Sequence, residues 1–140
     1  MTLVVDSSVA LTWCFEDERT PATAALLQRV AQSGAFAPML WPLEMLNVLA
    51  TAERRQRISA VQRHHLSGWM HQIPIKLDLE TAAQAWTATA LLAEQHRLTL
   101  YDACYLELAQ RMKLPLATLD QALRVAAPKL GVALLGADGD

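Results

Sequence analysis

Five short runs of apolar residues recur along the chain. Continuous runs of this length, without polar alternation, are typical of strands buried on both faces of a sheet. We predict strands over the following ranges: Leu3–Val5, Ala35–Met39, Ile73–Leu77, Leu114–Leu119 and Val132–Leu135. Pro38 weakens the second strand because proline donates no ladder hydrogen bond, whereas Pro115 lies near a strand start, where proline is tolerated.

Apolar positions three and four residues apart lie between these runs and predict amphipathic helices. After a short helix over Val9–Phe15, capped by Ser7 or Ser8, the predicted helix starts are Thr20-Pro21, Pro42, Ser59, Asp78 and Thr99. The predicted inward positions are Leu43, Leu46, Leu49 and Ala50 in the helix from Pro42 to about Arg57, and Ala82, Ala85, Trp86 and Thr89 in the helix after Asp78. Strands that alternate with helices predict an α/β fold, with a parallel sheet covered on both faces.

Composition narrows the class of protein. The chain has 140 residues, 53% hydrophobic and 19% charged, which favours one folded domain over a disordered chain. We expect this domain to span 1–135 and the polar residues 136–140 to form a flexible tail. No apolar stretch reaches the roughly 18 uninterrupted residues of a membrane helix, and two cysteines suit a reducing cytoplasm. A net charge of −2 argues against a protein that coats nucleic acid, but permits an enzyme that holds it locally.

Four carboxylates lie where predicted strands end or helices begin. Asp6 and Asp120 follow predicted strands directly, and Glu44 and Asp102 lie in the first turns of predicted helices. Because the carboxyl ends of parallel strands share one edge of a sheet, we expect these four side chains to meet there. Each of them alone is also explained as a helix cap or as a charge that complements a helix dipole.

Together, the four carboxylates indicate a cation site. At an apolar edge they would repel one another and raise their own pKa values unless a divalent cation lay among them. Oxygen ligands favour Mg²⁺ or Mn²⁺. Ser8, Asn47 and Thr118 lie beside these acids in sequence and could orient a carboxylate or a metal-bound water, although local turn and cap bonding explains the two hydroxyls equally well.

Four short motifs carry a family resemblance. They are VVDSSVAL at 4–11, WPLEMLNVL at 41–49, LYDA at 100–103 and LATLD at 116–120. Their order and spacing resemble those of PIN domains, particularly the VapC-like toxins of bacterial type II toxin–antitoxin pairs. The resemblance covers nearly the whole chain and implies a three-layer α/β/α sandwich around a short parallel sheet.

The resemblance also implies an activity and partners. It implies an endoribonuclease that depends on Mg²⁺ or Mn²⁺, forms a homodimer, acts on RNA and is held inactive by a cognate antitoxin protein. Asp6 and Asp102 would bind the metal directly. Asp120 would bind it directly or through water, and Glu44 would hold a metal-bound water. The sequence does not indicate which RNA is cleaved.

Two other functions compete with this interpretation. A phosphatase with Asp6 as its nucleophile would need a second aspartate two residues later, where the chain has Ser8. A PIN-like binding module without catalysis would not need all four acids. Arg54, Arg55, Arg57 and Arg63 could contact an RNA backbone, but a solvated helix end is the favoured interpretation. For most of the four tryptophans we expect core or interface roles.

Overall fold

The computed structural model describes residues 2–140, which contain a five-stranded parallel sheet of order β3-β2-β1-β4-β5. Its strands are β1 (Val4–Val5), β2 (Ala35–Pro38), β3 (Ile75–Asp78), β4 (Leu116–Ala117) and β5 (Leu134–Leu135). The predicted parallel sheet is confirmed. The fourth and fifth strands are shorter than predicted, because only two residues of each pair with a neighbour.

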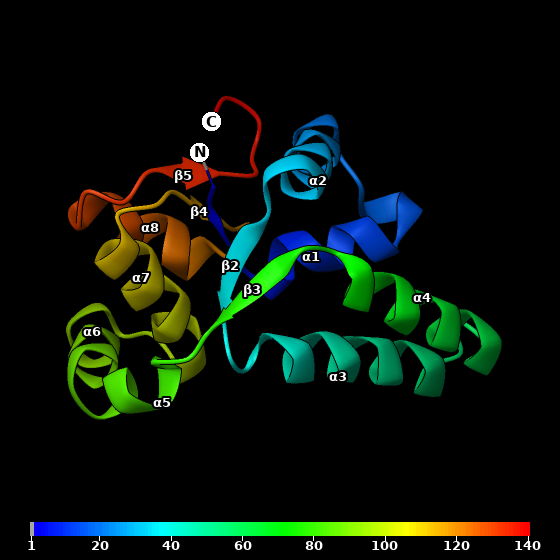
Figure 1. Ribbon diagram of the computed structural model, residues 1–140, viewed down its shortest axis with the longest axis horizontal. Helices are drawn as coiled ribbons and strands as arrows, with labels where there is room; N and C mark the ends of the chain where they lie inside the picture. Colours follow the sequence, from blue (N-terminus) through cyan, green and yellow to red (C-terminus); the bar gives the residue numbers. More distant parts are fainter. Residues whose placement is uncertain (1) are drawn as a thin grey trace.

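Helices cover both faces of the sheet, which confirms the three-layer architecture. They are α1 (Ser7–Cys14), α2 (Pro21–Ser33), α3 (Trp41–Arg54), α4 (Ala60–Gln72), α5 (Thr81–Gln84), α6 (Ala90–His96), α7 (Leu100–Met112) and α8 (Gln121–Lys129), with a 3₁₀ turn at Glu16–Glu18 and a π turn at Ala85–Thr89. Figure 1 shows α1 to α4 on one side of the strands and α5 to α8 on the other. Within the described residues, no helix is long and apolar enough to cross a membrane.

Local sequence sets several helix starts as predicted. Thr20 and Ser59 each form a capping box, and the Thr99 hydroxyl accepts a hydrogen bond from the Asp102 backbone N–H at 3.1 Å. Gly34 ends α2 with a φ of 75°, and a Cβ there would lie 3.2 Å from the Pro74 carbonyl oxygen. This turn therefore requires glycine for both its backbone conformation and its close approach to the chain before β3.

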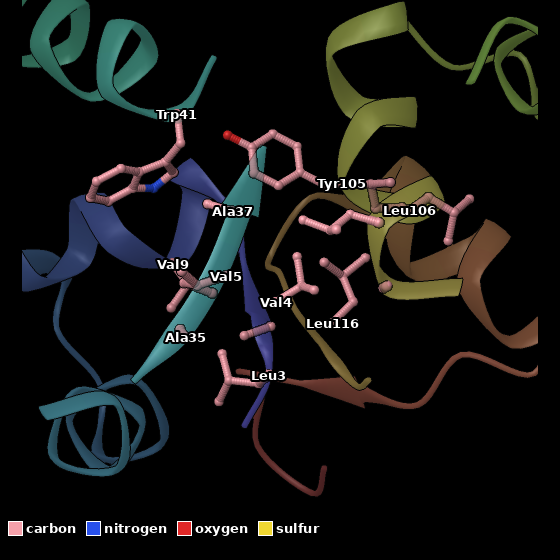
Figure 2. Close-up of a cluster of buried hydrophobic side chains, with 14 of the residues drawn as sticks. Leu3, Val4, Val5, Val9, Ala35, Ala37, Trp41, Tyr105, Leu106 and Leu116 are labelled. Atoms are coloured by element: carbon pink, nitrogen blue, oxygen red, sulfur yellow. The ribbon is translucent and has the colours of Figure 1, made fainter. Parts of the chain in front are cut away.

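The core lies on both faces of β1. Its side chains alternate, so Val4 faces Leu116 and α7 while Val5 lies with Val9 of α1 (Figure 2). All four of these residues are fully buried. Tyr105 of α7 lies in the same core and is 1% exposed. The alternation anchors both helix layers to one short strand, which fixes the chain where Asp6 follows.

The predicted inward face of α3 is wrong in part. Leu43 is 72% exposed and Leu46 is 48% exposed. The buried positions instead follow Trp41, Met45 and Leu49 at four-residue spacing. The helix begins at Trp41, one residue earlier than predicted, and burial of that large indole rotates the apolar stripe away from Leu43.

Two predictions about the segment after β3 are also wrong. Trp86 is 88% exposed rather than inward, because the π turn at Ala85–Thr89 changes the helical phase. Asp78 does not cap the following helix; it ends β3, and α5 begins after Glu80. The Asp78 side chain instead lies beside Arg111 of α7.

The predicted tail, residues 136–140, has contacts with α8. Arg124 Nη2 lies 2.6 Å from Asp140 Oδ1, and the Ala137 N–H donates to Asp140 Oδ2 at 2.7 Å. Arg124 Nη1 also donates to the Thr118 carbonyl at 2.7 Å. These contacts join the end of the chain to the segment after β4. The flexibility of the tail stays a prediction.

Candidate metal centre

Asp6 and Asp120 lie where the order of the sheet reverses. β1 pairs with β2 on one side and with β4 on the other. Asp6 immediately follows β1, and Asp120 follows β4 after two intervening residues. In open parallel sheets, ligands bind at such a switch point, beyond the carboxyl ends of the strands. The topology therefore offers a binding site between these two aspartates.

Asp6 is tightly held. Its Oδ1 accepts hydrogen bonds from Ser8 Oγ at 2.6 Å and from the Val9 N–H at 3.1 Å, and its Oδ2 accepts one from Thr118 Oγ1. Asp6 therefore caps α1, so the predicted serine cap is wrong, while Ser8 and Thr118 orient its carboxylate. Burial raises the pKa of Asp6 to about 6, against these three hydrogen bonds, and the charge of Asp120 raises it further.

The other carboxylates are linked to Asp6 by their charges. Burial raises the pKa of Asp102, and so does the charge of Asp120. Burial also raises the pKa of Glu44; a hydrogen bond from Tyr105 opposes this change, and the charge of Asp102 adds to it. Asp6, Asp120, Asp102 and Glu44 are therefore linked in pairs through their charges, and we call these four acids the carboxylate site. Asp120 also caps α8 by accepting from the Leu123 N–H at 3.0 Å.

Tyr105 is a contact that sequence reasoning missed. Its hydroxyl donates to Glu44 Oε1, and Figure 2 shows the oxygen pointing out of the core past the end of β2, toward the region of Trp41. Burial, and then the bond to Glu44, raise the pKa of Tyr105. One signal was available in the sequence: Tyr105 follows Asp102 by three residues and therefore lies on the same face of α7.

Asn47 is the least engaged of the predicted site residues. It lies on α3, one turn beyond Glu44, and its side chain is exposed. In the part of the chain described, the Asn47 side chain makes no hydrogen bond. Its helix position matches the prediction, but nothing yet connects its amide to a carboxylate.

The donors of the carboxylate site are all oxygens, the ligand type that Mg²⁺ and Mn²⁺ prefer. Among residues 2–140, no three His, Cys, Asp or Glu side chains form a ready metal-ligand group. None of the four carboxylates forms a salt bridge within these residues, so their charges have no cationic partner. Mg²⁺ needs only one or two protein carboxylates because it keeps several waters. The donor set and its uncompensated charge therefore fit a hydrated divalent cation.

Comparison with known proteins identifies the family. The family model for the PIN domain matches residues 3–128, which is most of the chain. The chain belongs to the PIN domain family. This membership accounts for the sheet order and for the four motifs that end at, or begin beside, the carboxylate site. No curated protein sequence matches this PIN domain.

Solved structures share its fold at low sequence identity. FitAcB from Neisseria gonorrhoeae is 16% identical with a TM-score of 0.66, and covers 97% of each chain. VapBC2 from Rickettsia felis, bound to a DNA fragment from its promoter, is 11% identical with a TM-score of 0.66, and covers 99% of this chain and 100% of the other. PAE2754 from Pyrobaculum aerophilum is 20% identical with a TM-score of 0.65, and the match covers 96% of this chain and 89% of the other.

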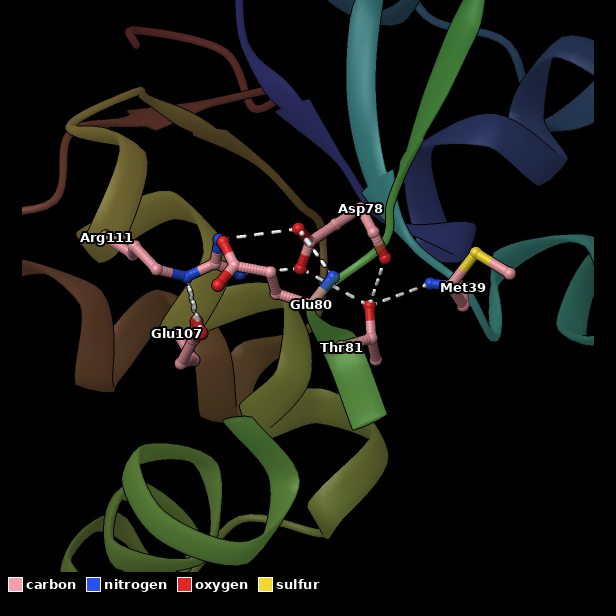
Figure 3. A network of polar contacts seen from close by, with 6 residues as sticks. All are labelled: Met39, Asp78, Glu80, Thr81, Glu107 and Arg111. Atoms are coloured by element: carbon pink, nitrogen blue, oxygen red, sulfur yellow. Dashed lines mark hydrogen bonds and ion pairs between the residues drawn. The ribbon is translucent and has the colours of Figure 1, made fainter. Parts of the chain in front are cut away.

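A second group of carboxylates carries its own cation (Figure 3). Arg111 Nη2 lies 2.5 Å from Asp78 Oδ2, Nε lies 2.8 Å from Glu107 Oε1, and Nη1 lies 3.1 Å from Glu80 Oε2. Thr81 Oγ1 donates to the Asp78 carbonyl at 2.9 Å. We call these three acids and Arg111 the Arg111 cluster. It ties β3 and the start of α5 to α7, which is a structural role.

Two members of the predicted arginine cluster also have partners. Arg57 Nη2 lies 2.9 Å from Asp17 Oδ1, and its guanidinium carbon lies 3.9 Å from the centre of the Phe15 ring. Arg63 pairs with Glu53. All four of these charged side chains are at least a third exposed. Arg57 and Arg63 are thus paired with acids around the turn between α3 and α4.

Proposed function

We propose that this PIN domain is a metal-dependent endoribonuclease, the toxin of a VapBC-type toxin–antitoxin pair, that hydrolyses RNA phosphodiester bonds with Mg²⁺ or Mn²⁺. The observation that carries the proposal is the carboxylate site. Asp6 and Asp120 lie at the switch point of the sheet, and the charge of Asp120 acts on Asp102 as that of Asp102 acts on Glu44. None of the four acids has a cationic partner within residues 2–140. An anionic substrate would be repelled from such a site unless cations reversed its charge.

The family resemblance supplies the proposed roles. Asp6 and Asp102 would bind the metal directly, Asp120 would bind it directly or through water, and Glu44 would hold a metal-bound water. Ser8 and Thr118 keep the buried Asp6 carboxylate in one orientation. A bound divalent cation would polarise the phosphoryl oxygen, lower the pKa of an attached water and stabilise the leaving oxygen.

The test is cleavage of a defined RNA by purified protein. We expect cleavage with Mg²⁺ or Mn²⁺, loss of cleavage when a chelator removes the metal, and recovery when the metal is restored. A DNA strand of the same sequence, incubated in parallel, tests the RNA preference. RNA that stays intact at every Mg²⁺ and Mn²⁺ concentration would contradict the proposal and favour the binding module without catalysis.

The structure argues against the aspartate-nucleophile phosphatase. Asp6 is 3% exposed, and both of its oxygens already accept hydrogen bonds. The position that would carry the second aspartate is Ser8, whose hydroxyl donates to Asp6 and accepts from the Leu119 N–H at 2.8 Å. Ser8 therefore occupies the position of the second aspartate that such a phosphatase needs.

We also propose that an antitoxin segment binds between α3 and α4. These helices and β3 line an apolar groove of about 650 Å³. Trp41 lines it, and its Nε1–H is buried without a hydrogen-bond partner in the described part of the chain. The buried indole of Trp41 therefore forms part of the wall of the groove. Calorimetry of the binding of a candidate antitoxin tests the proposal. A loss of affinity in Trp41→Phe would indicate that the antitoxin binds in this groove.

A homodimer is the proposed assembly. Leu79 and Trp86, which lie before and after α5, are 86% and 88% exposed. Large apolar side chains exposed to this extent are typical of protein–protein interfaces. Sedimentation equilibrium measures the mass directly. A species of twice the 15.4 kDa chain supports the dimer, and a monomer at all concentrations contradicts it.

A further inference from the structure

The bond between Tyr105 and Glu44 joins the two helical layers at the edge where the carboxylates gather. Glu44 lies in the first turn of α3, and Tyr105 lies on α7, on the opposite side of the sheet (Figure 1). The Tyr105 ring is fully packed in the core, while its hydroxyl donates to Glu44 Oε1. A rigid aromatic ring therefore fixes the position of its terminal oxygen, and with it one carboxylate oxygen of Glu44.

Glu44 has little else to hold it. The first turn of α3 has no side-chain cap, and within residues 2–140 the Tyr105 hydroxyl is the donor that Glu44 engages. Asp6, by contrast, accepts three hydrogen bonds from residues on two segments. Glutamate also has one more rotatable bond than aspartate, and it is repelled by the nearby charge of Asp102. Without Tyr105, the Glu44 carboxylate would be free to swing toward solvent.

We propose that Tyr105 is a positioning residue for the carboxylate site: its hydroxyl holds Glu44 Oε1 and leaves Oε2 available to a cation. The inference rests on the proposed function, because it assigns Tyr105 a task in cation binding. A hydroxyl that donates to one carboxylate oxygen leaves the lone pairs of the other oxygen available to a cation or its water. Residues that orient metal ligands in this way typically contribute 10- to 100-fold in metal affinity.

The test is a double-mutant cycle between Tyr105→Phe and Glu44→Ala, read out by Mn²⁺ affinity in calorimetry. Phenylalanine keeps the buried ring and removes only the hydroxyl, and alanine removes the acceptor of its hydrogen bond. We expect Tyr105→Phe to weaken Mn²⁺ binding about tenfold in the wild-type background and to have no further effect in Glu44→Ala. Tyr101→Phe is the matched control, since Tyr101 is exposed on the first turn of the same helix; its Mn²⁺ affinity should not change.

Thermal unfolding of each metal-free variant separates positioning from simple packing. If Tyr105→Phe lowers the melting temperature but leaves Mn²⁺ affinity unchanged, Tyr105 is a core residue and the inference fails while the proposed function stands. An equal loss of affinity in the wild-type and Glu44→Ala backgrounds also overturns it, because the effect would not pass through Glu44. If wild-type protein neither binds Mn²⁺ nor cleaves RNA, the proposed function fails first and the inference falls with it.

Discussion

The carboxylate site and the Arg111 cluster are two groups of acids that differ in whether a cationic side chain lies beside them. In the Arg111 cluster, Asp78 and Glu107 are buried, with side chains 10% and 4% exposed, and one guanidinium pairs with both. Bonding to Asp78, before any other influence, raises the pKa of Arg111. In the carboxylate site, Asp6 is just as buried but has no cationic partner within the described residues.

The difference shows what each cluster needs. Burying a charge destabilises a protein unless the charge is paired. In the Arg111 cluster, the guanidinium of Arg111 pairs with the acids. The carboxylate site instead carries raised pKa values at Asp6, Glu44 and Asp102. Acids with raised pKa values and no partner of opposite charge are typical of functional sites, where a ligand supplies the missing charge. The contrast therefore favours an external cation at one cluster and a structural role for the other.

The largest expected effect is on RNA cleavage. Asp6→Asn and Asp102→Asn should each lower the cleavage rate about hundredfold or more, because loss of a metal ligand costs at least as much as loss of its hydrogen-bond partner. Asp138→Asn, an exposed change in the tail, is the control and should cleave as wild type. Full cleavage by either site variant, in a preparation free of contaminating nuclease, would contradict the mechanism.

The next largest effect is the loss of stability when the ion pairs of the Arg111 cluster are removed. Arg111→Met should lower the free energy of unfolding by about 3–5 kcal/mol, because it leaves Asp78 and Glu107 buried without a cation. Arg63→Met removes a pair whose side chains are 39% and 37% exposed, and should cost at most about 1 kcal/mol. Urea unfolding measures both. Equal losses in the two variants would show that burial does not distinguish these ion pairs.

A smaller effect concerns pH and stability without metal. The pKa of Asp6 rises from 3.8 to about 6 on folding, so the folded state binds the proton more tightly than the unfolded state. Ionised Asp6 therefore destabilises metal-free protein progressively between about pH 4 and pH 6, and fully above pH 6. Asp6→Asn should be more stable than wild type by about 3 kcal/mol at pH 7.5, with the difference vanishing below about pH 4.

Urea unfolding at several pH values, with a chelator present, checks this prediction. The comparison of interest is the difference between the two proteins at each pH, since groups remote from Asp6 titrate equally in both and cancel. A difference that does not change between pH 4 and pH 7.5 would mean that Asp6 does not carry an unpaired charge in the folded state.

The features that sequence predicted well depend on neighbours along the chain. Thr20, Ser59 and Thr99 cap helices through bonds that span three residues, and short patterns reveal them. The positions of Asp6 and Asp120 after strands follow from the parallel topology. The meeting of all four acids around one cation, and their roles toward it, stay proposals.

The features that sequence missed depend on contacts across space. The Arg111 cluster joins side chains more than 30 positions apart, and Asp78 looked like a helix cap because only its local neighbours were visible. Tyr105 and Glu44 are separated by 61 positions. The exposure of Trp86 follows from a π turn, which has no clear sequence signature. Tertiary packing decides each of these outcomes.

The most direct test of the carboxylate site is a calorimetric titration of Mn²⁺ into folded wild-type protein and into Asp102→Asn, with Arg111→Met as a comparison variant if it folds. We predict saturable binding to wild type and a dissociation constant at least about tenfold weaker in Asp102→Asn, because the cation loses a carboxylate ligand. Equal Mn²⁺ affinity in wild type and folded Asp102→Asn would contradict the claim that these four carboxylates form one cation site.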